Sequence, residues 1–590
     1  MRKEKLNIFF VLLSLCLLLV ACSSPDETVD NGGNQTLLIY MCGSDLESRK
    51  GYASKNIGEM MSADLPSNVN VLIQTGGAKA WHNENISASN IGRYEIQNGQ
   101  LKSIQTLPQS SMGDGDTLLS FLTFAKEHYA TENVSLIFWD HGNGAEGSVC
   151  YDELYQYDAL TLTEIDHALK QANMQFEFIG FDACLMATYD TAKVLDDYAD
   201  YMIASQELEP ASGWDYKALL EALEEKDFYS KVLNAYAARQ DSKTYYTLSV
   251  VQLSELSIVD QIIGKIIDNI NTDISMLGEA LNYSTQFGAN ETSRNKTNLF
   301  DLSDFAQNLG IACDLDQFIK TANGSARQSA GGLSIYFPAE KIDNQNDYIE
   351  MCQNTLYADF LTSYINRIPE NPIQFENRGY DDNGKLSFVL TEESLPYVQS
   401  VRYDVHIYAD GATDTDDASL LYCVGADNDI MQRYALYTVD FSGRWIYLND
   451  TLLHCDILDE QDGYTLFYAP VIIDKQYCYL IFSYAKSTKT ASIEGYIEGG
   501  EIGSRINPLG DGTEIRVIYE IVNDGEDVEY YEEGVITYGS DTTISVKPLE
   551  KGYYQYIPKV VDIYGNAYYA DTAIVSFDGT TVTVVDISAG

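Results

Sequence analysis

The stretch "FIGFDACLMATYD" at residues 178–190 decides how this chain folds, because it places an acid and a cysteine directly after an apolar run. Apolar runs of this kind are typical of strands that are buried on both faces of a parallel sheet. The residues that follow such a strand leave the sheet at its carboxyl end, where open α/β sheets collect their ligands. The sequence therefore predicts that Asp182 and Cys184 lie at the ligand-binding edge of a sheet.

Several further apolar runs alternate with amphipathic segments on both sides of this stretch. This alternation predicts a parallel sheet with helices on its faces. One predicted helix follows Asp116 as its N-cap, and another begins with a capping box formed by Thr161 and Glu164. The predicted strands are residues 36–43, 69–77, 133–142, 176–184 and 201–205.

The composition changes at about residue 369, where Tyr- and Thr-rich alternation broken by Gly, Asn and Asp begins. These hairpin signals at short spacing predict one or two all-β, sandwich-like modules. The expected organisation is a signal at 1–22, a flexible linker at 23–35, an α/β domain at 36–368 and a β-rich accessory region at 369–590.

The first residues of the chain have the layout of a secretory signal, with basic residues before an apolar run at 8–20. This run is too short to span a bilayer. The "LVAC" that ends on Cys22 resembles a bacterial lipoprotein signal, which implies cleavage before Cys22, a lipid on its thiol and an extracytoplasmic, membrane-anchored protein. An ordinary signal peptide that is cut nearby is the alternative.

The charge and cysteine content narrow the class of protein further. The chain has 88 acidic and 37 basic residues and a net charge of -51. Nucleic acid is therefore excluded as an expected partner, because binding to phosphate needs a basic face. The cysteines do not occur in the closely spaced pairs that a zinc site would show. Some of them could form structural disulfides, but their spacing does not predict which ones pair. The cysteines beyond the signal and Cys22 are Cys42, Cys150, Cys184, Cys313, Cys352, Cys423, Cys455 and Cys478.

A second strand, ending at Trp139, delivers "DHG" at residues 140–142. If this strand neighbours the one before Cys184, His141 and Cys184 leave the sheet side by side, as a nucleophile and its base require. The backbone N–H groups of Gly142 and Cys184 could then stabilise an oxyanion. We also expect Cys184 to begin a helix, which would lower its thiol pKa. Alternatively, the cysteine is a small apolar filler and "DHG" is a turn.

Five blocks together resemble the clostripain family of cysteine peptidases, over residues 36 to about 365, with the β-rich region outside the match. The resemblance implies a caspase-like fold, a His141/Cys184 dyad, an oxyanion hole from the backbone of Gly142 and Cys184, and cleavage after arginine or lysine. The blocks are "LLIYMCGSDLES" (37–48), "LIFWDHGNG" (136–144), "FIGFDACLMATYD" (178–190), "ASQELEPASGWDY" (204–216) and "GGLSIYFP" (331–338).

The resemblance also points to a pocket for the basic side chain of the substrate. The first acid of this pocket in the family corresponds to Asp182, whose carboxylate could bind a guanidinium. The alternative is a structural role for Asp182, such as helix capping. Glu207, Glu209 and Asp215 are all candidates for the second acid, and the sequence does not choose among them. Family members often cut themselves after a basic residue between the two blocks, yet residues 141–169 contain no Lys or Arg.

The expected function is a lipid-anchored, extracytoplasmic cysteine endopeptidase acting on proteins or peptides with basic residues. No cofactor is required and no metal site is identified, although calcium could bind acidic clusters at 414–419 or 523–527. The rival hypothesis is a non-catalytic surface lipoprotein that uses a peptidase-like domain and β modules for adhesion or ligand binding. Burial of the Cys184 sulfur away from solvent would favour this rival.

Overall fold

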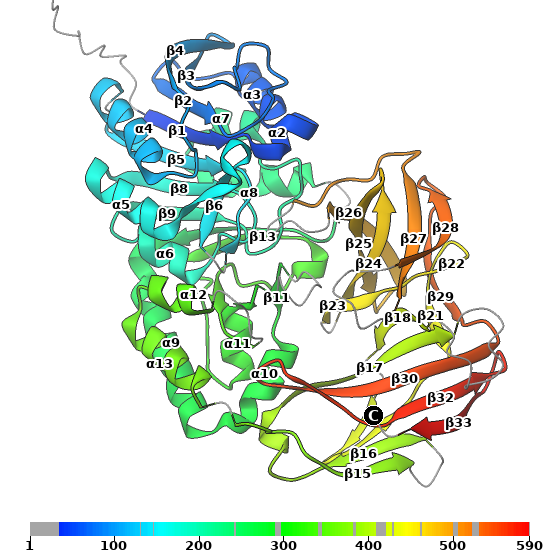
Figure 1. Cartoon of the computed structure of the whole chain (residues 1–590). Helices are drawn as coiled ribbons and strands as arrows, with labels where there is room; N and C mark the ends of the chain where they lie inside the picture. The colour runs from blue at the N-terminus through cyan, green and yellow to red at the C-terminus, as the bar shows by residue number, and fades with distance from the viewer. Residues whose placement is uncertain are drawn as a thin grey trace, which may run out of the picture.

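The computed structural model describes the chain from residue 35 to residue 588 (Figure 1). The predicted signal, Cys22 and residues 23–34 of the predicted linker therefore lie outside the described residues, whereas Gln35, the last residue of that linker, already begins the first strand. The internal gaps are residues 130, 145–146, 241–242, 289–296, 340–344, 368, 381–384, 409–420, 428–429, 461–462, 499–504 and 522–529.

A large mixed sheet forms the centre of the N-terminal part. Its five central strands are parallel, and antiparallel strands extend it at both edges. This confirms the predicted α/β class with a mostly parallel sheet. The strands, in order across the sheet, are β13 (Ile319–Asn323), β10 (Thr247–Gln252), β9 (Ala199–Ala204), β8 (Phe176–Asp182), β5 (Asn133–Trp139), β1 (Gln35–Cys42), β2 (Val69–Gly76), β3 (Asn90–Gln97) and β4 (Gln100–Pro108).

Helices cover both faces of this sheet because alternate residues of each central strand are apolar on opposite sides. In β1, Leu38 and Tyr40 pack against one group of helices, while Leu37 and Ile39 pack against the other. The first group contains α4 (Gly115–His128), α5 (Leu162–Ala172), α6 (Tyr189–Leu195) and α9 (Leu256–Thr272). The second group contains α3 (Tyr52–Ser62), α7 (Tyr216–Ala222) and α8 (Phe228–Arg239).

The predicted N-cap is observed for one of the two predicted helices, and the other helix has a different N-cap residue. The capping box of Thr161 and Glu164 begins α5 as expected. Helix α4, however, begins at Gly115, and its N-cap is Asp114 in extended conformation, whose side chain accepts from the Asp116 N–H. The expectation that Asp116 caps this helix is therefore wrong, because Asp116 already lies in the first turn.

Shorter elements complete the N-terminal part. The segment 298–310, which reads as a helix in the sequence, divides into a short strand and a helix. These elements are α2 (Ser44–Lys50), β6 (Ser148–Asp152), β7 (Asp158–Thr161), α10 (Leu277–Tyr283), β11 (Gln286–Phe287), β12 (Leu299–Asp301), α11 (Leu302–Asn308), β14 (Ser334–Tyr336), α12 (Gln345–Met351) and α13 (Thr355–Ile365).

Apart from one 3-10 turn at Leu395–Tyr397, the regular elements of the described chain after α13 are strands, as the hairpin signals predict (Figure 1). The strands are β15 (Phe375–Tyr380), β16 (Leu386–Leu390), β17 (Val398–Tyr408), β18 (Leu421–Asp427), β19 (Ile430–Arg433), β20 (Leu436–Val439), β21 (Arg444–Leu448), β22 (Thr451–Leu452), β23 (Asp456–Glu460), β24 (Tyr464–Ile473), β25 (Gln476–Ala485), β26 (Thr490–Glu498), β27 (Glu514–Ile521), β28 (Tyr530–Thr537), β29 (Ile544–Pro548), β30 (Gly552–Asp562), β31 (Ala567–Tyr569), β32 (Thr572–Phe577) and β33 (Val582–Ser588).

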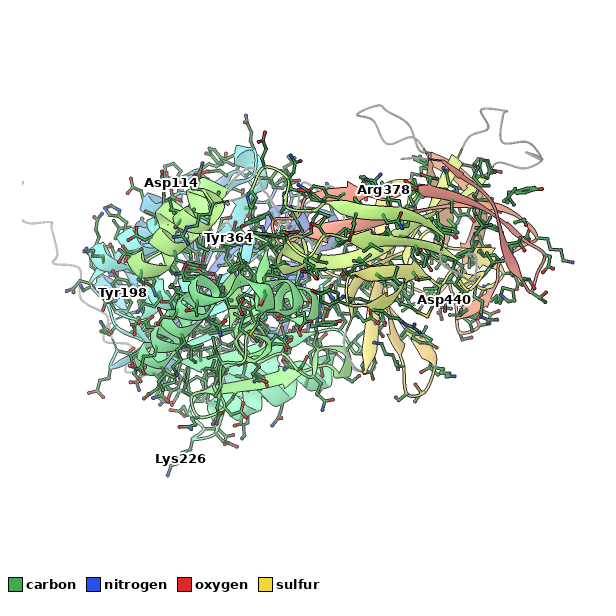
Figure 2. All side chains as sticks on the ribbon, turned by 90° about the horizontal axis from the view of Figure 1, so that it is seen from below. Asp114, Tyr198, Lys226, Tyr364, Arg378 and Asp440 are labelled. Carbon is green, nitrogen blue, oxygen red and sulfur yellow. The ribbon has the colours of Figure 1, made fainter. Side chains whose placement is uncertain are left out.

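The β-rich region packs directly against the helical part. Tyr364 of α13, which is labelled in Figure 2, makes one of these contacts. Its hydroxyl donates to the Ile563 carbonyl at 2.8 Å, and its ring lies 5.0 Å from that of Tyr564. The two parts therefore share a packed boundary, and residues far apart in the sequence can reach one site.

Candidate active site

Two neighbouring parallel strands deliver the predicted dyad to one edge of the sheet. Strands β5 and β8 pair in parallel, with Trp139 opposite Asp182, so His141 and Cys184 leave the sheet at the same level. The two loops are in contact, because a Cβ atom added to Gly142 would lie 2.4 Å from the Cys184 carbonyl oxygen. Glycine is therefore required at position 142, and the expected adjacency of the two strands is present.

His141 is held by an acid from α2. Its Nε2 atom lies 2.9 Å from Oδ1 of Asp45, and both side chains are only 7% exposed. Burial works to raise the pKa of Asp45, but the hydrogen bond to His141 and the charges of His141 and Arg49 outweigh it and leave the pKa lowered. Asp45 therefore keeps its charge and can fix the orientation of the imidazole. Asp45 lies in the block at 37–48, but no pattern in the sequence predicts a role for this residue.

Asp140, directly before His141, anchors the same loop. Its carboxylate accepts from the Ser44 hydroxyl and, at 2.5 Å, from the Tyr151 N–H. Complete burial raises the pKa of Asp140 to about 7, although the nearby His141 and Ser44 lower it in part. The loop that presents His141 is thus tied to both α2 and β6.

Cys184 is fully buried and does not begin a helix. Leu185 has a left-handed φ of 66°, and α6 begins only at Tyr189, where Thr188 provides the cap. Burial raises the pKa of the Cys184 thiol to about 12, even though Arg505 and the Glu209 N–H, 3.2 Å from the sulfur, both lower it. The expectation of a pKa lowered by a helix N-terminus is therefore wrong for this conformation.

Asp182 is fully buried, two residues before Cys184, and the space that its contacts enclose is called the Asp182 pocket below. Its Oδ2 atom accepts from the Tyr216 hydroxyl at 2.9 Å, and its Oδ1 atom from Nη2 of an arginine at the same distance. Gly213, with a φ of +58°, forms one wall, since a Cβ atom there would lie 2.8 Å from Asp182 Oδ1. The pocket is therefore shaped to hold a cation against Asp182.

The three candidates for the second acid have different surroundings. Glu209 borders the Asp182 pocket, where it accepts from Trp214 Nε1 at 3.2 Å, and its pKa is raised well above the usual range by burial and by the Asp182 charge. Glu207 instead forms a fully buried ion pair with Arg327, with 2.6 Å between Oε2 and Nη2. Asp215 caps α7 by accepting from the Ala218 N–H. Only Glu209 of the three therefore accompanies Asp182.

The cation in this pocket is Arg505, a residue of the β-rich region that the sequence analysis did not single out. Its Nη2 atom donates to the Asp182 carbonyl at 2.5 Å and to the Asp140 carbonyl at 3.3 Å, and its guanidinium lies 5.1 Å from the centre of the Trp139 ring. The cavity that remains beside His141 measures about 20 Å³, which holds about one water molecule. In this conformation the site is closed to a second basic side chain.

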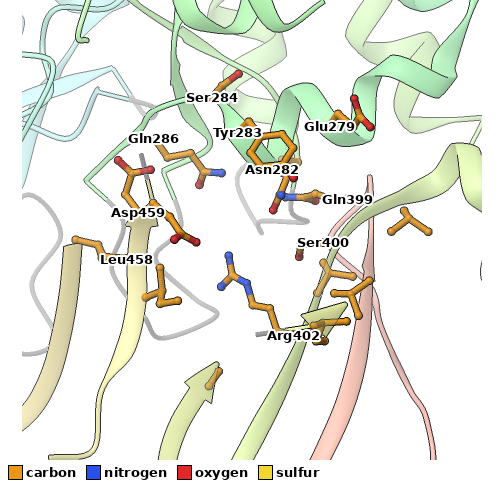
Figure 3. Close-up of a pocket in the computed structure, with 18 of the residues that line it drawn as sticks. Glu279, Asn282, Tyr283, Ser284, Gln286, Gln399, Ser400, Arg402, Leu458 and Asp459 are labelled. Carbon is orange, nitrogen blue, oxygen red and sulfur yellow. The ribbon is translucent and has the colours of Figure 1, made fainter. Parts of the chain in front are cut away.

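A much larger cavity of about 1750 Å³ lies between the helical part and the β-rich region, away from His141 and Cys184 (Figure 3). Figure 3 shows Arg402 pointing into this space toward Asp459, with Glu279 and Tyr283 of α10 above it. The lining is largely polar, and neither member of the predicted dyad belongs to it. This cavity therefore contributes nothing to the chemistry at the ends of β5 and β8.

Other predicted features can be placed only in part. The acidic clusters at 414–419 and 523–527 lie outside the described residues, and within the described chain no group of three His, Cys, Asp or Glu side chains could hold a metal. None of the eight cysteines beyond residue 35 forms a disulfide within the described chain. Among the described helices, none has the length and apolar character needed to cross a bilayer.

Comparisons with known proteins agree with the resemblance and extend it. The model of the clostripain family, peptidase family C11, matches residues 39–532, so the match continues into the β-rich region instead of ending near residue 365. Clostripain of Hathewaya histolytica is 27% identical over 137 residues, which are 20% of this chain and only 25% of that relative. The aligned part thus spans about a quarter of the curated relative.

Two solved structures are similar at low identity. A secreted C11 cysteine protease from Bacteroides thetaiotaomicron, in complex with an irreversible peptide inhibitor, is 20% identical and covers 56% of this chain and 99% of its own, with a TM-score of 0.43. An inactive zymogen C11 protease from Parabacteroides distasonis is also 20% identical and covers 56% of this chain and 96% of its own, with a TM-score of 0.39. Because the family model covers most of the sequence, this chain belongs to the clostripain family.

Proposed function

We propose that this protein is a cysteine endopeptidase that cleaves peptide bonds after arginine or lysine. The observation that carries the proposal is the pairing of β5 with β8, which brings His141 and Cys184 to one sheet edge beside a pocket lined by Asp182. A carboxylate pocket that already binds a guanidinium supports basic residues as the preferred substrate side chain.

In the proposed reaction, the Cys184 thiolate attacks the scissile carbonyl carbon and a carbon–sulfur bond forms. The backbone N–H groups of Gly142 and Cys184 stabilise the oxyanion. His141 carries the thiol proton to the leaving amine as the carbon–nitrogen bond breaks, and water then hydrolyses the thioester. Asp45 is a positioning residue in this scheme, since it contacts the imidazole and not the substrate.

The proposal includes the location and partners of the enzyme. Protein or peptide substrates with basic residues would be cut outside the cytoplasm by a chain anchored through a lipid on Cys22. The reaction needs no cofactor, and calcium binding at the acidic clusters remains part of the proposal. Mass spectrometry of the mature protein would test the anchor, which requires a diacylglyceryl cysteine as its first residue.

One observation favours the rival function of a non-catalytic surface lipoprotein. The Cys184 sulfur belongs to a fully buried residue, and Arg505 already fills the adjoining pocket. A binding protein with a peptidase-like domain would tolerate such a closed site permanently, whereas an enzyme must open it.

Covalent labelling separates the two functions. An arginyl chloromethyl ketone should modify Cys184 and none of the other seven thiols, and the protein should hydrolyse arginyl or lysyl fluorogenic peptides. The Cys184→Ala variant is the control and should do neither. Absence of both labelling and turnover in the wild-type chain and in a variant with Arg505 replaced by Gln, with and without calcium, would favour the rival function.

A further inference from the structure

The residues around Arg505 approach the site as a short added strand. The Ile506 N–H donates to the Glu209 carbonyl at 3.1 Å, and the Ala211 N–H donates to the Ile506 carbonyl at 3.0 Å. Ile506 thereby pairs in parallel with Pro210 in the loop that borders the pocket. Extended peptides commonly bind by adding a strand in this manner, with side chains entering pockets beside it. The arginine in the pocket is therefore presented as a bound peptide would present it.

Strand β26 of the β-rich region pairs with this short strand. Asn507 exchanges two backbone hydrogen bonds with Tyr496 of β26, at 2.8 and 2.9 Å. At the end of β26, Glu498 lies 2.8 Å from Arg49 on α2, the helix that also carries Asp45. The strand that enters the site is thus fixed to β26, and β26 in turn contacts the helix that carries Asp45.

A comparison with the second buried arginine shows that Arg505 is held less completely. Every guanidinium nitrogen of Arg327 has a partner among Glu207, Asp459 and Tyr245. For Arg505, all the hydrogen bonds of the guanidinium come from Nη2, and Nε and Nη1 have no partner in the described chain. A buried cation with two unpaired nitrogens is costly. Release of Arg505 would break one ion pair with a carboxylate, whereas release of Arg327 would break two.

The strand is bound but not presented for cleavage. The Arg505 carbonyl accepts from the side-chain amide of Asn507 at 3.3 Å, within its own strand. The following N–H, of Ile506, is engaged by the Glu209 carbonyl. Both groups of the peptide bond after Arg505 are therefore occupied by partners outside the predicted oxyanion hole of Gly142 and Cys184.

We propose that Arg505 is an internal inhibitor, which occupies the Asp182 pocket in place of a basic substrate residue and keeps this peptidase latent until the β-rich region releases it. The inference rests on the proposed function, because it concerns regulation of the same site. It also accounts for the absence of Lys and Arg in residues 141–169, since displacement of Arg505 would open the site without a cut there.

The test compares the wild-type chain with Arg505→Gln and Arg505→Lys, using an arginyl fluorogenic peptide and the arginyl chloromethyl ketone. Arg505→Gln should raise kcat/KM and the labelling rate of Cys184 by about tenfold or more, because an intramolecular ligand acts at an effective concentration of about millimolar. Arg505→Lys, which keeps the charge without the planar fork, should fall between the two. Arg516→Gln, at an exposed arginine of β27, is the matched control and should equal wild type.

A second measurement needs no variant, in case Arg505→Gln leaves Asp182 without a cation and fails to fold. The labelling rate of the wild-type chain should reach a plateau as the ketone concentration rises, because opening of the site then limits the reaction. A linear rise without a plateau, or equal rates in wild type and Arg505→Gln, would overturn the inhibitor and leave the proposed function standing. Cleavage of the chain after Arg505, seen by mass spectrometry, would make the strand a substrate and would also overturn it. If no chain turns over or is labelled, the proposed function itself fails.

Discussion

At the scale of single residues, the site depends on charges that are paired over long stretches of chain. Asp45 contacts His141 across 96 positions, and Arg505 contacts Asp182 across 323. Loss of one partner from either pair would be costly in free energy, because an unpaired buried charge is far less stable than an exposed one. The surroundings of His141 and Asp182 are therefore set by residues that no local sequence pattern connects to them.

Replacement of Asp45 by Asn should reduce kcat/KM by about tenfold or more, because the imidazole loses the carboxylate that orients it and stabilises its protonated form. Loss of this negative charge should also move the pH profile of kcat/KM to lower pH, since a nearby anion favours the charged imidazole. Initial rates measured from pH 5 to pH 9 test both effects.

Asp64→Asn, at an exposed position between α3 and β2, serves as the control for Asp45→Asn and should leave the profile unchanged. A reduced rate with an unmoved profile would mean that Asp45 only supports the fold. A profile that moves to higher pH would contradict the assigned charge pairing.

The candidate site could be predicted from the sequence only as far as local patterns reach. The apolar strands ending at Trp139 and Asp182 were sufficient to propose His141, Cys184 and Gly142, because parallel strands end at a shared edge. The sequence could not predict that Glu209, and neither Glu207 nor Asp215, lies beside Asp182. All three acids lie in one loop, and the ion pair that occupies Glu207 comes from a distant element. Arg505 gave no signal, because nothing in its neighbourhood marks it as a residue of the site.

At the scale of elements, the central strands were the most predictable, and the hairpin of β3 and β4 was missed. The central strands are nearly continuous in apolar residues and therefore stand out. Strand β4 is mostly exposed or half-buried, so it has little apolar signal of its own. Edge strands of this kind are specified by pairing with a neighbour, which sequence periodicity does not report.

The capping box at the start of α5 permits a quantitative test of an element. Thr161→Ala should lower the free energy of unfolding by about 1 kcal/mol, since the Thr161 hydroxyl accepts from the Glu164 N–H and its own N–H is bound by the Glu164 side chain. Urea denaturation followed by circular dichroism measures the change.

Thr163→Ala is the matched control for this cap, because Thr163 is exposed in the first turn of α5 and has no capping role. This control should change stability by less than about 0.5 kcal/mol. Equal losses from both substitutions would show that the capping box does not stabilise the helix.

At the scale of the whole molecule, buried ion pairs join the α/β part to the β-rich region. Arg327 lies between Glu207 of the site loop and Asp459 of β23, and all three side chains are at most 8% exposed. These contacts and the boundary at Tyr364 explain why the two parts form one packed structure and not two separate modules.

Replacement of Arg327 by Met should lower the free energy of unfolding by about 3–5 kcal/mol, because Glu207 would remain buried without its cation. The chain as a whole should then unfold at a lower denaturant concentration, as measured by urea titration. Arg516→Met breaks only exposed ion pairs and should cost about 1 kcal/mol or less. A loss of the same size in both variants would contradict the role of Arg327 as the joint between the two parts.

The position of Arg505 late in the chain has a consequence for how the protein is made. A nascent chain completes Asp182 long before the ribosome reaches its counterion, so the early product must keep hydrated a carboxylate that the finished protein encloses. The sheet edge can therefore close only after most of the polypeptide has been synthesised, and a shortened chain ending before this arginine would retain a solvated, open cleft.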